Sequence, residues 1–397
     1  MADALSAFRC LLTGSQQARP EEITALTNRA AELLDAREMA LYLVDYGQLI
    51  LVPLVGVGAP ARDAVRIDGT LPGRAYALSE TYETGDDTGR RLWIPLLDGT
   101  SRLGVLEVCT TGDPSPQLRA DYHAVANLLA ELLTSFRFYS DLVERTRRSV
   151  PMQLAAEIVW SLLPPLTFHA PDVAITAILE PCYDVGGDAF DYAVNGHVLH
   201  TAIFDAVGHG IEACALTSLT VSAYRNARRC GLDLVDTYRS IDKWVAARHP
   251  GSFVTAILTE LDTRQGVYRR ICAGHPGELL LRESKLVKTL RAPTAMPLGL
   301  ASLVNLLPRV DEEVLQPGDQ LLLYTDGVIE ARTVDGEFFG RDRLADFLTR
   351  TLAGQVSGPE TLRRLVQAIL THHGEQLQDD ASAVLIGWPS PAPSSTV

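Results

Sequence analysis

The hydrophobic pattern divides the chain into two differently built parts. In the first, apolar residues recur at helical spacing within residues 21–36, which predicts an amphipathic helix. Two strand-like runs follow at residues 39–56 and 90–110, and the polar segment "DGTSRLG" inside the second run predicts a hairpin turn. We therefore expect an α/β domain over residues 1–120.

The order of helix, hairpin, second hairpin and long helix, together with the segment "LWIPLLDGTSRLGVLEV", resembles GAF-type sensor domains. The resemblance implies a domain that receives a small-molecule or protein signal. Because these residues contain no ligand-specific motif, a purely structural or dimerising role is the alternative.

A stripe of apolar residues, spaced alternately three and four positions apart, runs through residues 122–143. It consists of Tyr122, Val125, Leu129, Leu132, Phe136, Tyr139 and Val143. This spacing fits a helix packed on its own domain, and it also fits the seam of a parallel coiled coil, which would make the protein a homodimer. In the second interpretation residues 121–165 form a helical linker, interrupted at Pro151, that carries a signal from the first domain.

From residue 172 onward, strands alternate irregularly with pairs of helices. Strands are expected at 172–181, 197–205, 253–262, 266–274, 277–281, 319–327 and 381–388, and helices at about 211–229, 233–248, 341–353 and 358–373. This order predicts a layered α+β domain over residues 166–388, so the whole chain is α+β. The "PSPAPSSTV" tail at residues 389–397 is expected to be disordered.

Charge and cysteine content narrow the possible partners. The formal net charge is −14, and no basic cluster is larger than "RTRR" at residues 145–148, which argues against nucleic acid or an anionic membrane as the partner. No apolar run approaches the roughly 20 residues of a membrane span, and the N-terminus carries an acid where a signal peptide needs positive charge, so we expect a cytoplasmic protein. The six cysteines form no C-x-x-C pair, which argues against a zinc cage or a redox dithiol.

Aspartates stand at the ends of several predicted strands. They are Asp188, Asp205, Asp326, Asp379 and Asp380. A carboxylate at the end of a buried strand is costly unless its charge is compensated, and converging carboxylates raise one another's pKa unless a cation lies between them. Each alone has a simpler explanation, since Asp-Gly is a common turn, but the set favours a site for a hard divalent ion such as Mg²⁺ or Mn²⁺.

Six segments occur in the order found in PPM-type metal-dependent serine/threonine phosphatases. They are "VGGDAFD", "FDAVGHG", "AGHPG", "MPLGL", "LLLYTDGVIEA" and "QDDASAVLI", and they most resemble the SpoIIE/RsbU-like branch. The segment "AAEIVWSLLPP" is similar to the helix that introduces this domain. The resemblance implies an α-β-β-α sandwich with two metal ions, Mn²⁺ or Mg²⁺, in a cleft at one edge of its two sheets.

The same resemblance assigns the metal ligands residue by residue. Asp188 is expected to bind one ion, and Asp205 to bridge both, with the backbone carbonyl of Ala206 on one of them. Asp326 and Asp379 are expected to hold the other ion. A water activated by the two ions would then attack the phosphorus directly, without a covalent intermediate on the enzyme.

Other residues are expected in supporting roles. Asp191 and Asp380 are expected to support the ligands through hydrogen bonds. His209 would either donate a proton to the leaving group or, as the simpler interpretation, brace the glycine turn, and His275 is expected to be a structural loop residue. The sequence departs from the family at Val207, where a small or polar residue is usual, which leaves the ligands intact but affects the shape of the cleft.

The resemblance implies an enzyme that removes phosphate from a phosphoserine of a STAS-type anti-sigma-factor antagonist, regulated by its sensor domain. We expect deletion of residues 1–120 to change its specific activity. A catalytically weak domain that only binds a signalling partner is the alternative. Two other phosphoryl-transfer chemistries lack their motifs, because no cysteine is followed by an arginine in the spacing C-x5-R and no G-x-x-x-x-G-K-[ST] loop occurs.

Overall fold

The computed structural model describes residues 3–86, 89–184, 186–290, 295–304, 307–333, 335–373 and 379–389. The chain forms two compact units, Met1–Pro151 and Met152–Val397. The predicted linker is therefore divided between the units at Pro151 and is not a separate element. Most of the tail predicted to be disordered lies outside the described residues.

The N-terminal unit is built on one antiparallel sheet in the order β3-β2-β1-β6-β5-β4. Its strands are β1 (Ala36–Val44), β2 (Ile50–Pro53), β3 (Val65–Arg66), β4 (Tyr82–Asp86), β5 (Gly89–Asp98) and β6 (Ser101–Thr110). Its helices are α1 (Ala4–Gln17), a short 3₁₀ turn (Pro20–Glu22), α2 (Ile23–Leu33), α3 (Leu71–Leu78), α4 (Pro116–Phe136) and α5 (Leu142–Arg147). The predicted hairpin is confirmed, because β5 and β6 pair down to Asp98 and Ser101.

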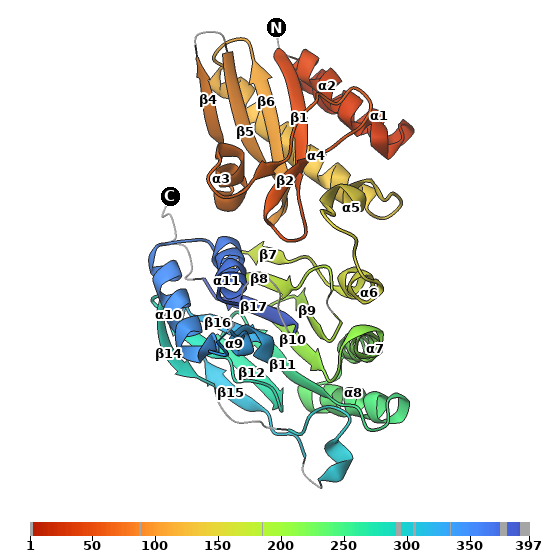
Figure 1. Ribbon diagram of the computed structural model, residues 1–397, viewed down its shortest axis with the longest axis vertical. Helices are drawn as coiled ribbons and strands as arrows, with labels where there is room; N and C mark the ends of the chain where they lie inside the picture. The colour runs from red at the N-terminus through yellow and green to blue at the C-terminus, as the bar shows by residue number, and fades with distance from the viewer. Residues whose placement is uncertain are drawn as a thin grey trace. The chain divides into compact units, whose positions relative to one another are not determined.

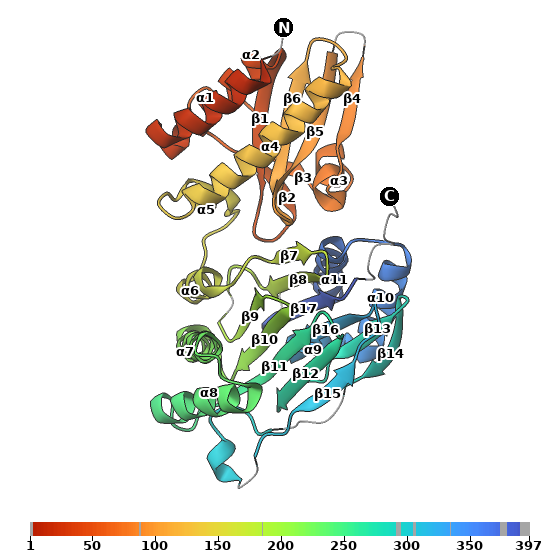
Figure 2. The same ribbon diagram turned by 180° about the vertical axis from the view of Figure 1, so that it is seen from behind.

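Successive side chains of β1 point to opposite faces of the sheet, and both faces are buried. Met39, Leu41 and Leu43 pack under α1, α2 and α4, whereas Tyr42 packs on the other face with α3. Figure 2 shows α1, α2 and α4 lying across the same side of the sheet. The stripe on α4 faces this core, and Tyr122 is fully buried.

The stripe at residues 122–143 thus follows the first interpretation, a helix packed on its own domain. Val125 and Leu129 are fully buried in the N-terminal unit, so they are not available as the seam of a coiled coil. The helix also ends at Phe136, and Tyr139 is 65% exposed beyond it. The expected homodimer through this segment has no support in the arrangement of these side chains.

The C-terminal unit contains two antiparallel sheets, ordered β15-β12-β11-β10-β9 and β14-β13-β16-β17-β8-β7. The first sheet comprises β9 (Asp188–Asn195), β10 (Val198–Ala206), β11 (Val254–Asp262), β12 (Val267–Ala273) and β15 (Asp311–Val314). The second comprises β7 (Thr167–Ala170), β8 (Val173–Glu180), β13 (Leu279–Arg282), β14 (Lys285–Thr289), β16 (Gln320–Tyr324) and β17 (Ala381–Gly387). The helices are α6 (Leu154–Leu162), α7 (Gly210–Arg229), α8 (Leu234–Arg248), α9 (Asp326–Glu330), α10 (Gly340–Ala353) and α11 (Gly358–His373), with a 3₁₀ turn at Ala301–Leu303.

The two sheets of this unit face each other across one hydrophobic core. Phe190 and Ile203 from one sheet pack with Leu323 and Val384 from the other. The outer face of the first sheet is covered by α7 and α8, and that of the second by α10 and α11. Figure 1 shows these helix pairs on opposite sides of the sheets, so the layers run helix, sheet, sheet, helix as predicted.

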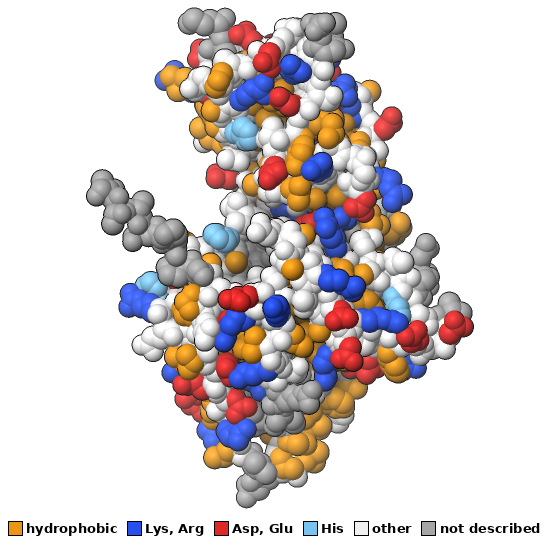
Figure 3. All heavy atoms as spheres, turned by 90° about the vertical axis from the view of Figure 1, so that its left-hand side faces the viewer, with side chains coloured by type: hydrophobic (Ala, Val, Ile, Leu, Met, Phe, Trp, Pro, Cys, Tyr) orange, Lys and Arg blue, Asp and Glu red, His pale blue; other side chains and the backbone are white. Residues whose placement is uncertain are grey.

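Neither unit contains, in its described part, a helix with the length and hydropathy needed to cross a bilayer. On the face seen in Figure 3, acidic and basic side chains are interspersed, so this face has no large patch of one charge.

Candidate active site

Aspartates from both sheets of the C-terminal unit meet where their strands end. Asp188 begins β9 and lies opposite Asp205 near the end of β10. Asp326 begins α9 directly after β16, and Asp379 and Asp380 directly precede β17, the strand paired with β16. Antiparallel pairing thus brings all five predicted strand-end aspartates to one edge.

Asp188 is the most buried of them, with 2% exposure. The Thr325 hydroxyl donates a hydrogen bond to its Oδ2 at 2.7 Å, and Thr325 is itself held by the Ser382 N–H at 2.9 Å. Burial, with Asp205 and Asp380 nearby, raises the pKa of Asp188 well above its usual value. The carboxyl is therefore placed firmly but its negative charge is not compensated.

Asp205 also lies close to other carboxylates of the site. Its pKa is raised to about 7, first by burial and then by Asp326 and Asp379. Its Oδ2 lies 3.3 Å from the Thr255 hydroxyl, which lies 2.7 Å from Nδ1 of the buried His275. Burial and the neighbouring Asp379 raise the pKa of Asp326 too, so the acidic side chains repel one another.

Asp380 fixes the loop that carries Asp188. Its Oδ2 accepts hydrogen bonds from the backbone N–H groups of Gly186, Gly187 and Asp188 at 3.0, 2.7 and 3.2 Å. Its neighbour Asp379 is exposed at the mouth of the site. Asp380 is thus a carboxylate that holds three successive backbone N–H groups, and its role in supporting metal ligands stays a prediction.

The glycines around the aspartates allow close backbone packing. A Cβ on Gly186 would lie 2.8 Å from the backbone nitrogen of Gly210, and one on Gly187 would lie 2.9 Å from the carbonyl oxygen of Ala206. At Gly327 a Cβ would lie 2.0 Å from the Asp380 carbonyl oxygen. Any larger residue at these positions would push the aspartate-bearing segments apart.

The donor set fits a hard divalent cation. All donors are carboxylate or carbonyl oxygens, and in the described ranges no lysine or arginine forms an ion pair with any of the five aspartates. Neighbouring carboxylates that have no cation between them are expected to have raised pKa values. No three Asp, Glu, His or Cys side chains in the described part form a ready-made ion cage, so binding would draw the carboxylates closer together.

Comparison with known proteins gives a family for the C-terminal part of the chain. Residues 195–389, just under half of the chain, match the family described as Stage II sporulation protein E (SpoIIE). The C-terminal part of the chain is a SpoIIE-type phosphatase domain. The matched segment includes Asp205, Asp326 and Asp379, begins after Asp188, and leaves the N-terminal unit without a family assignment.

Two of the curated relatives that align with the chain are Protein IcfG and Phosphoserine phosphatase RsbU. Protein IcfG of Synechocystis sp. (strain ATCC 27184 / PCC 6803 / Kazusa) is 24% identical over 242 residues, covering 53% of this chain and 37% of IcfG. Phosphoserine phosphatase RsbU of Bacillus subtilis (strain 168) is 23% identical over 237 residues, covering 59% of this chain and 69% of RsbU. The chain thus spans little more than a third of the length of IcfG.

Among solved structures, the RsbU and RsbW domains of Rv1364c from Mycobacterium tuberculosis are similar to this chain. The sequence identity is 30% and the TM-score is 0.46, with 58% of this chain and 64% of that chain covered.

Asp191 does not support the SpoIIE-type site as expected. It lies three residues after Asp188 on β9, so its side chain points to the opposite face of the strand. There it is buried against α7, paired with Arg225 at 2.6 Å and Arg228 at 2.8 Å. Arg225 also donates to the Leu162 carbonyl at the end of α6, so Asp191 serves to join β9, α6 and α7.

His209 is exposed directly before α7, and its side chain makes no capping hydrogen bond to that helix. The expected bracing role is therefore not seen, and the side chain is exposed to solvent. Val207 is 42% exposed, while its backbone N–H donates to the Phe253 carbonyl at 3.1 Å. The unusual valine thus adds apolar surface beside Asp205 without displacing the loop.

Sequence reasoning missed three threonines of the SpoIIE-type domain. Thr325 and Thr255 contact Asp188 and Asp205, and the buried Thr217 of α7 donates to the Gly187 carbonyl. Thr325 belongs to the "YTDG" segment, and its place in that motif, directly before Asp326, could have marked it as a candidate site residue. Thr255 and Thr217 lie in an ordinary strand and an ordinary helix, where nothing in the local sequence marks them.

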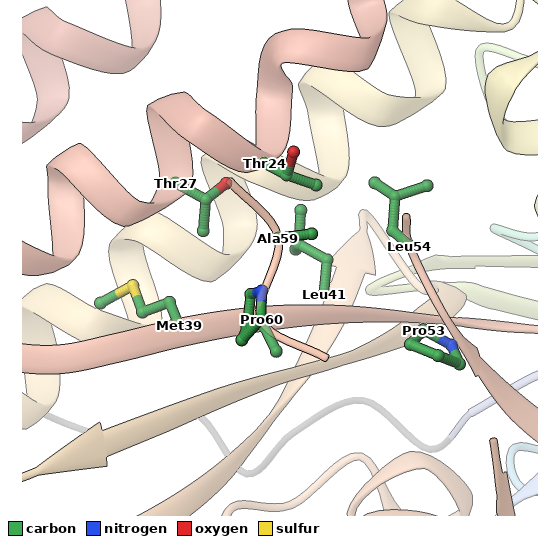
Figure 4. A pocket seen from close by; sticks show the side chains of 9 residues that line it. Thr24, Thr27, Met39, Leu41, Pro53, Leu54, Ala59 and Pro60 are labelled. Carbon is green, nitrogen blue, oxygen red and sulfur yellow. The ribbon is translucent and has the colours of Figure 1, made fainter. Parts of the chain in front are cut away.

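In the described part of the N-terminal unit, a small hollow lies between α2 and β1 and is seen in Figure 4. It is lined by Thr24, Thr27, Met39, Ala40, Leu41, Pro53, Leu54, Ala59 and Pro60. Its volume is about 10 Å³, room for about one water molecule. In this conformation the hollow has no space for a small-molecule signal.

Proposed function

We propose that the protein is a metal-dependent phosphoserine/phosphothreonine protein phosphatase. The observation that carries the proposal is the meeting of aspartates from both sheets, with raised pKa values and no basic partner among the described residues. Oxygen donors of this kind suit two Mn²⁺ or Mg²⁺ ions. The resemblance to "Phosphoserine phosphatase RsbU" supports the same reaction class.

In this proposal the ions would be held by the carboxylates of Asp188, Asp205, Asp326 and Asp379 and by the backbone carbonyl of Ala206. Bound ions would supply an acidified water and take up charge from the phosphoryl oxygens. Asp205 and Asp188 are then the central catalytic groups, because both are positioned by hydrogen bonds before any ion binds.

His209 is the candidate proton donor to the leaving seryl or threonyl oxygen. It is exposed, lies at the turn that follows Asp205, and has no competing hydrogen bond to α7. A donor at this place would stabilise the alkoxide as it departs.

The substrate we propose is a phosphorylated STAS-type anti-sigma-factor antagonist, in a partner-switching pathway. Support comes from the resemblance to RsbU and to a chain described as containing RsbU and RsbW domains.

The N-terminal unit is proposed to be a GAF-like sensor that regulates the phosphatase. A physical route begins at α6, the first helix of the C-terminal unit, where Ala156 and Val159 pack with Cys214 of α7. Thr217, one turn further along α7, holds the Gly187 carbonyl beside Asp188. A shift of α6 would therefore reach the loop that positions Asp188.

A binding module without turnover is the alternative. The experiment that separates the two uses the full chain, stripped with a chelator, and measures phosphate release from a phosphoserine peptide as Mn²⁺ is added back. We expect turnover that requires Mn²⁺ and disappears in Asp205→Ala. A folded wild-type protein that binds phosphopeptide but releases no phosphate at any Mn²⁺ concentration would support the alternative.

A further inference from the structure

Val207 directly follows Asp205 and Ala206 and continues the pairing of β10 with β11. Its backbone N–H donates to the Phe253 carbonyl at 3.1 Å, which extends the ladder by one residue beyond the Ala206–Val254 pair. Side chains two positions apart in paired, extended backbone point to the same face of the sheet. Val207 therefore stands on the face that carries Asp205, about 7 Å further along the strand.

This position makes Val207 an apolar side chain at the mouth of the site. It is 42% exposed, whereas Asp205 is partly buried. A single exposed valine on a protein surface normally needs no explanation. This valine differs from others because it shares a strand face with a carboxylate of the candidate active site.

The loop that follows Val207 leaves room for a substrate chain. Gly208 and Gly210 have positive φ angles of 97° and 70°. A Cβ built on either glycine would meet no atom of the described residues within 4 Å, so open space lies beside both. The main chain of another molecule can approach glycine closely because no side chain stands in the way.

The proposed reaction brings the substrate chain to this loop. Its phosphoryl group would lie at the ions beside Asp205, and its leaving oxygen would lie near His209, the candidate proton donor. The main chain of the substrate is two covalent bonds from that oxygen. Alternate side chains of an extended peptide lie on one side, about 7 Å apart, which matches the spacing of Asp205 and Val207. A side chain close in sequence to the phosphorylated residue thus falls over Val207.

We propose that Val207 is a specificity-determining residue, which favours an apolar side chain within two positions of the phosphorylated serine or threonine. The inference rests on the proposed function, because that function places the phosphoryl group at the aspartates. An apolar neighbour would bury its surface against the valine, which is favourable. A polar side chain in the same place would lose water and gain no hydrogen bond from the valine.

The test uses the full chain with Mn²⁺ and a series of phosphoserine peptides of otherwise identical sequence. Each peptide carries leucine or glutamine at one of the four positions −2, −1, +1 and +2. The measured quantity is the ratio of kcat/KM for the leucine peptide to kcat/KM for the glutamine peptide. Because the ratio compares two substrates on the same protein, any effect of a substitution on the ions cancels.

Two substitutions at Val207 are compared with one control. Val207→Thr keeps the branched shape but replaces a methyl group by a hydroxyl, and Val207→Ala removes apolar surface without adding a polar group. Val314→Thr is the matched control, because Val314 is a 62% exposed valine on β15, an edge strand of the same sheet. It lies three strands from β10, a distance of about 14 Å.

We expect the wild type to prefer leucine by about tenfold at one or more of these positions. This is the lower end of what one apolar contact gives, because Val207 lies at an open surface and not in a closed pocket. Val207→Thr and Val207→Ala should reduce the ratio to below about threefold, and Val314→Thr should keep the wild-type ratio.

The outcomes separate the inference from the function it rests on. If the wild type releases phosphate from none of the peptides, the proposed function itself is wrong. If the wild type hydrolyses the leucine and glutamine peptides equally well at all four positions, the specificity role is refuted. A leucine preference that Val207→Thr and Val207→Ala retain as fully as Val314→Thr does would also refute it.

Discussion

The electrostatics of the site predict that Asp205→Asn, in protein stripped of metal, is more stable than the wild type at alkaline pH. The pKa of Asp205 is raised from 3.8 to about 7 in the folded protein. The folded state therefore binds this proton more tightly than the unfolded chain does. Stability linked to this carboxyl is complete below about pH 4 and is lost as the pH rises through about 7.

The size of the effect follows from the pKa difference. At about 1.4 kcal/mol for each pKa unit, ionised Asp205 costs the folded state up to about 4 kcal/mol. The asparagine has nearly the same shape, keeps an oxygen facing Thr255 and cannot ionise. It should therefore unfold at a higher temperature at pH 8, and each kcal/mol amounts to about 2–4 °C in a domain of this size.

The assay is thermal unfolding of both proteins in chelator at several pH values between 4 and 8. We expect the difference between them to shrink toward zero as the pH falls to about 4. Asp191→Asn is the matched control, because Asp191 is a buried aspartate paired with Arg225 and Arg228. Breaking this buried pairing should lower stability by about 3–5 kcal/mol. If Asp205→Asn were no more stable than the wild type at pH 8, the picture of repelling, uncompensated carboxylates would be wrong.

Three further predictions concern individual parts of the account. His209→Gln should lower kcat about a hundredfold on a phosphoserine peptide but change it little on p-nitrophenyl phosphate, whose leaving group needs no proton, and equal losses on both would contradict a role as proton donor. Thr325→Val should lower the free energy of unfolding by about 1–3 kcal/mol, because Asp188 and the Ser382 N–H both lose a buried partner, while Thr325→Ser should not. A chain that begins at Met152 should differ from the full chain in kcat for the phosphopeptide, and identical kinetics would rule out control by the N-terminal unit.

The structure changes where that truncation has to be made. A cut after residue 120, as the sequence suggested, would leave most of α4 in the truncated chain without the core it covers. The apolar stripe on α4 could not distinguish a coiled coil from packing on the same domain, because both bury the same residues at the same spacing. The two interpretations are separated by the sheet of the N-terminal unit, whose strands are distant in sequence and form the core on which α4 packs.

The sequence predicted most strands and helices of the C-terminal unit because their signal is local, a period of two or of about 3.6 residues. β9 was not predicted as a separate strand, and Asp191 was therefore expected to support the metal ligands. Alternation along β9 would have placed Asp188 and Asp191 on opposite faces. The contact between Thr255 and His275 joins residues 20 positions apart, so it could not be predicted before the packing of β11 and β12 was known.

The central claim is that the strand-end aspartates form a centre for two catalytic ions, and ion counting tests it most directly. Stripped wild-type protein would be titrated with Mn²⁺ in a calorimeter, with phosphate release from the phosphoserine peptide followed along the same titration. The account predicts two Mn²⁺ per chain, activity that rises with their binding, and loss of both binding and activity in Asp205→Ala. Full activity without bound metal, or wild-type Mn²⁺ binding in Asp205→Ala, would contradict it.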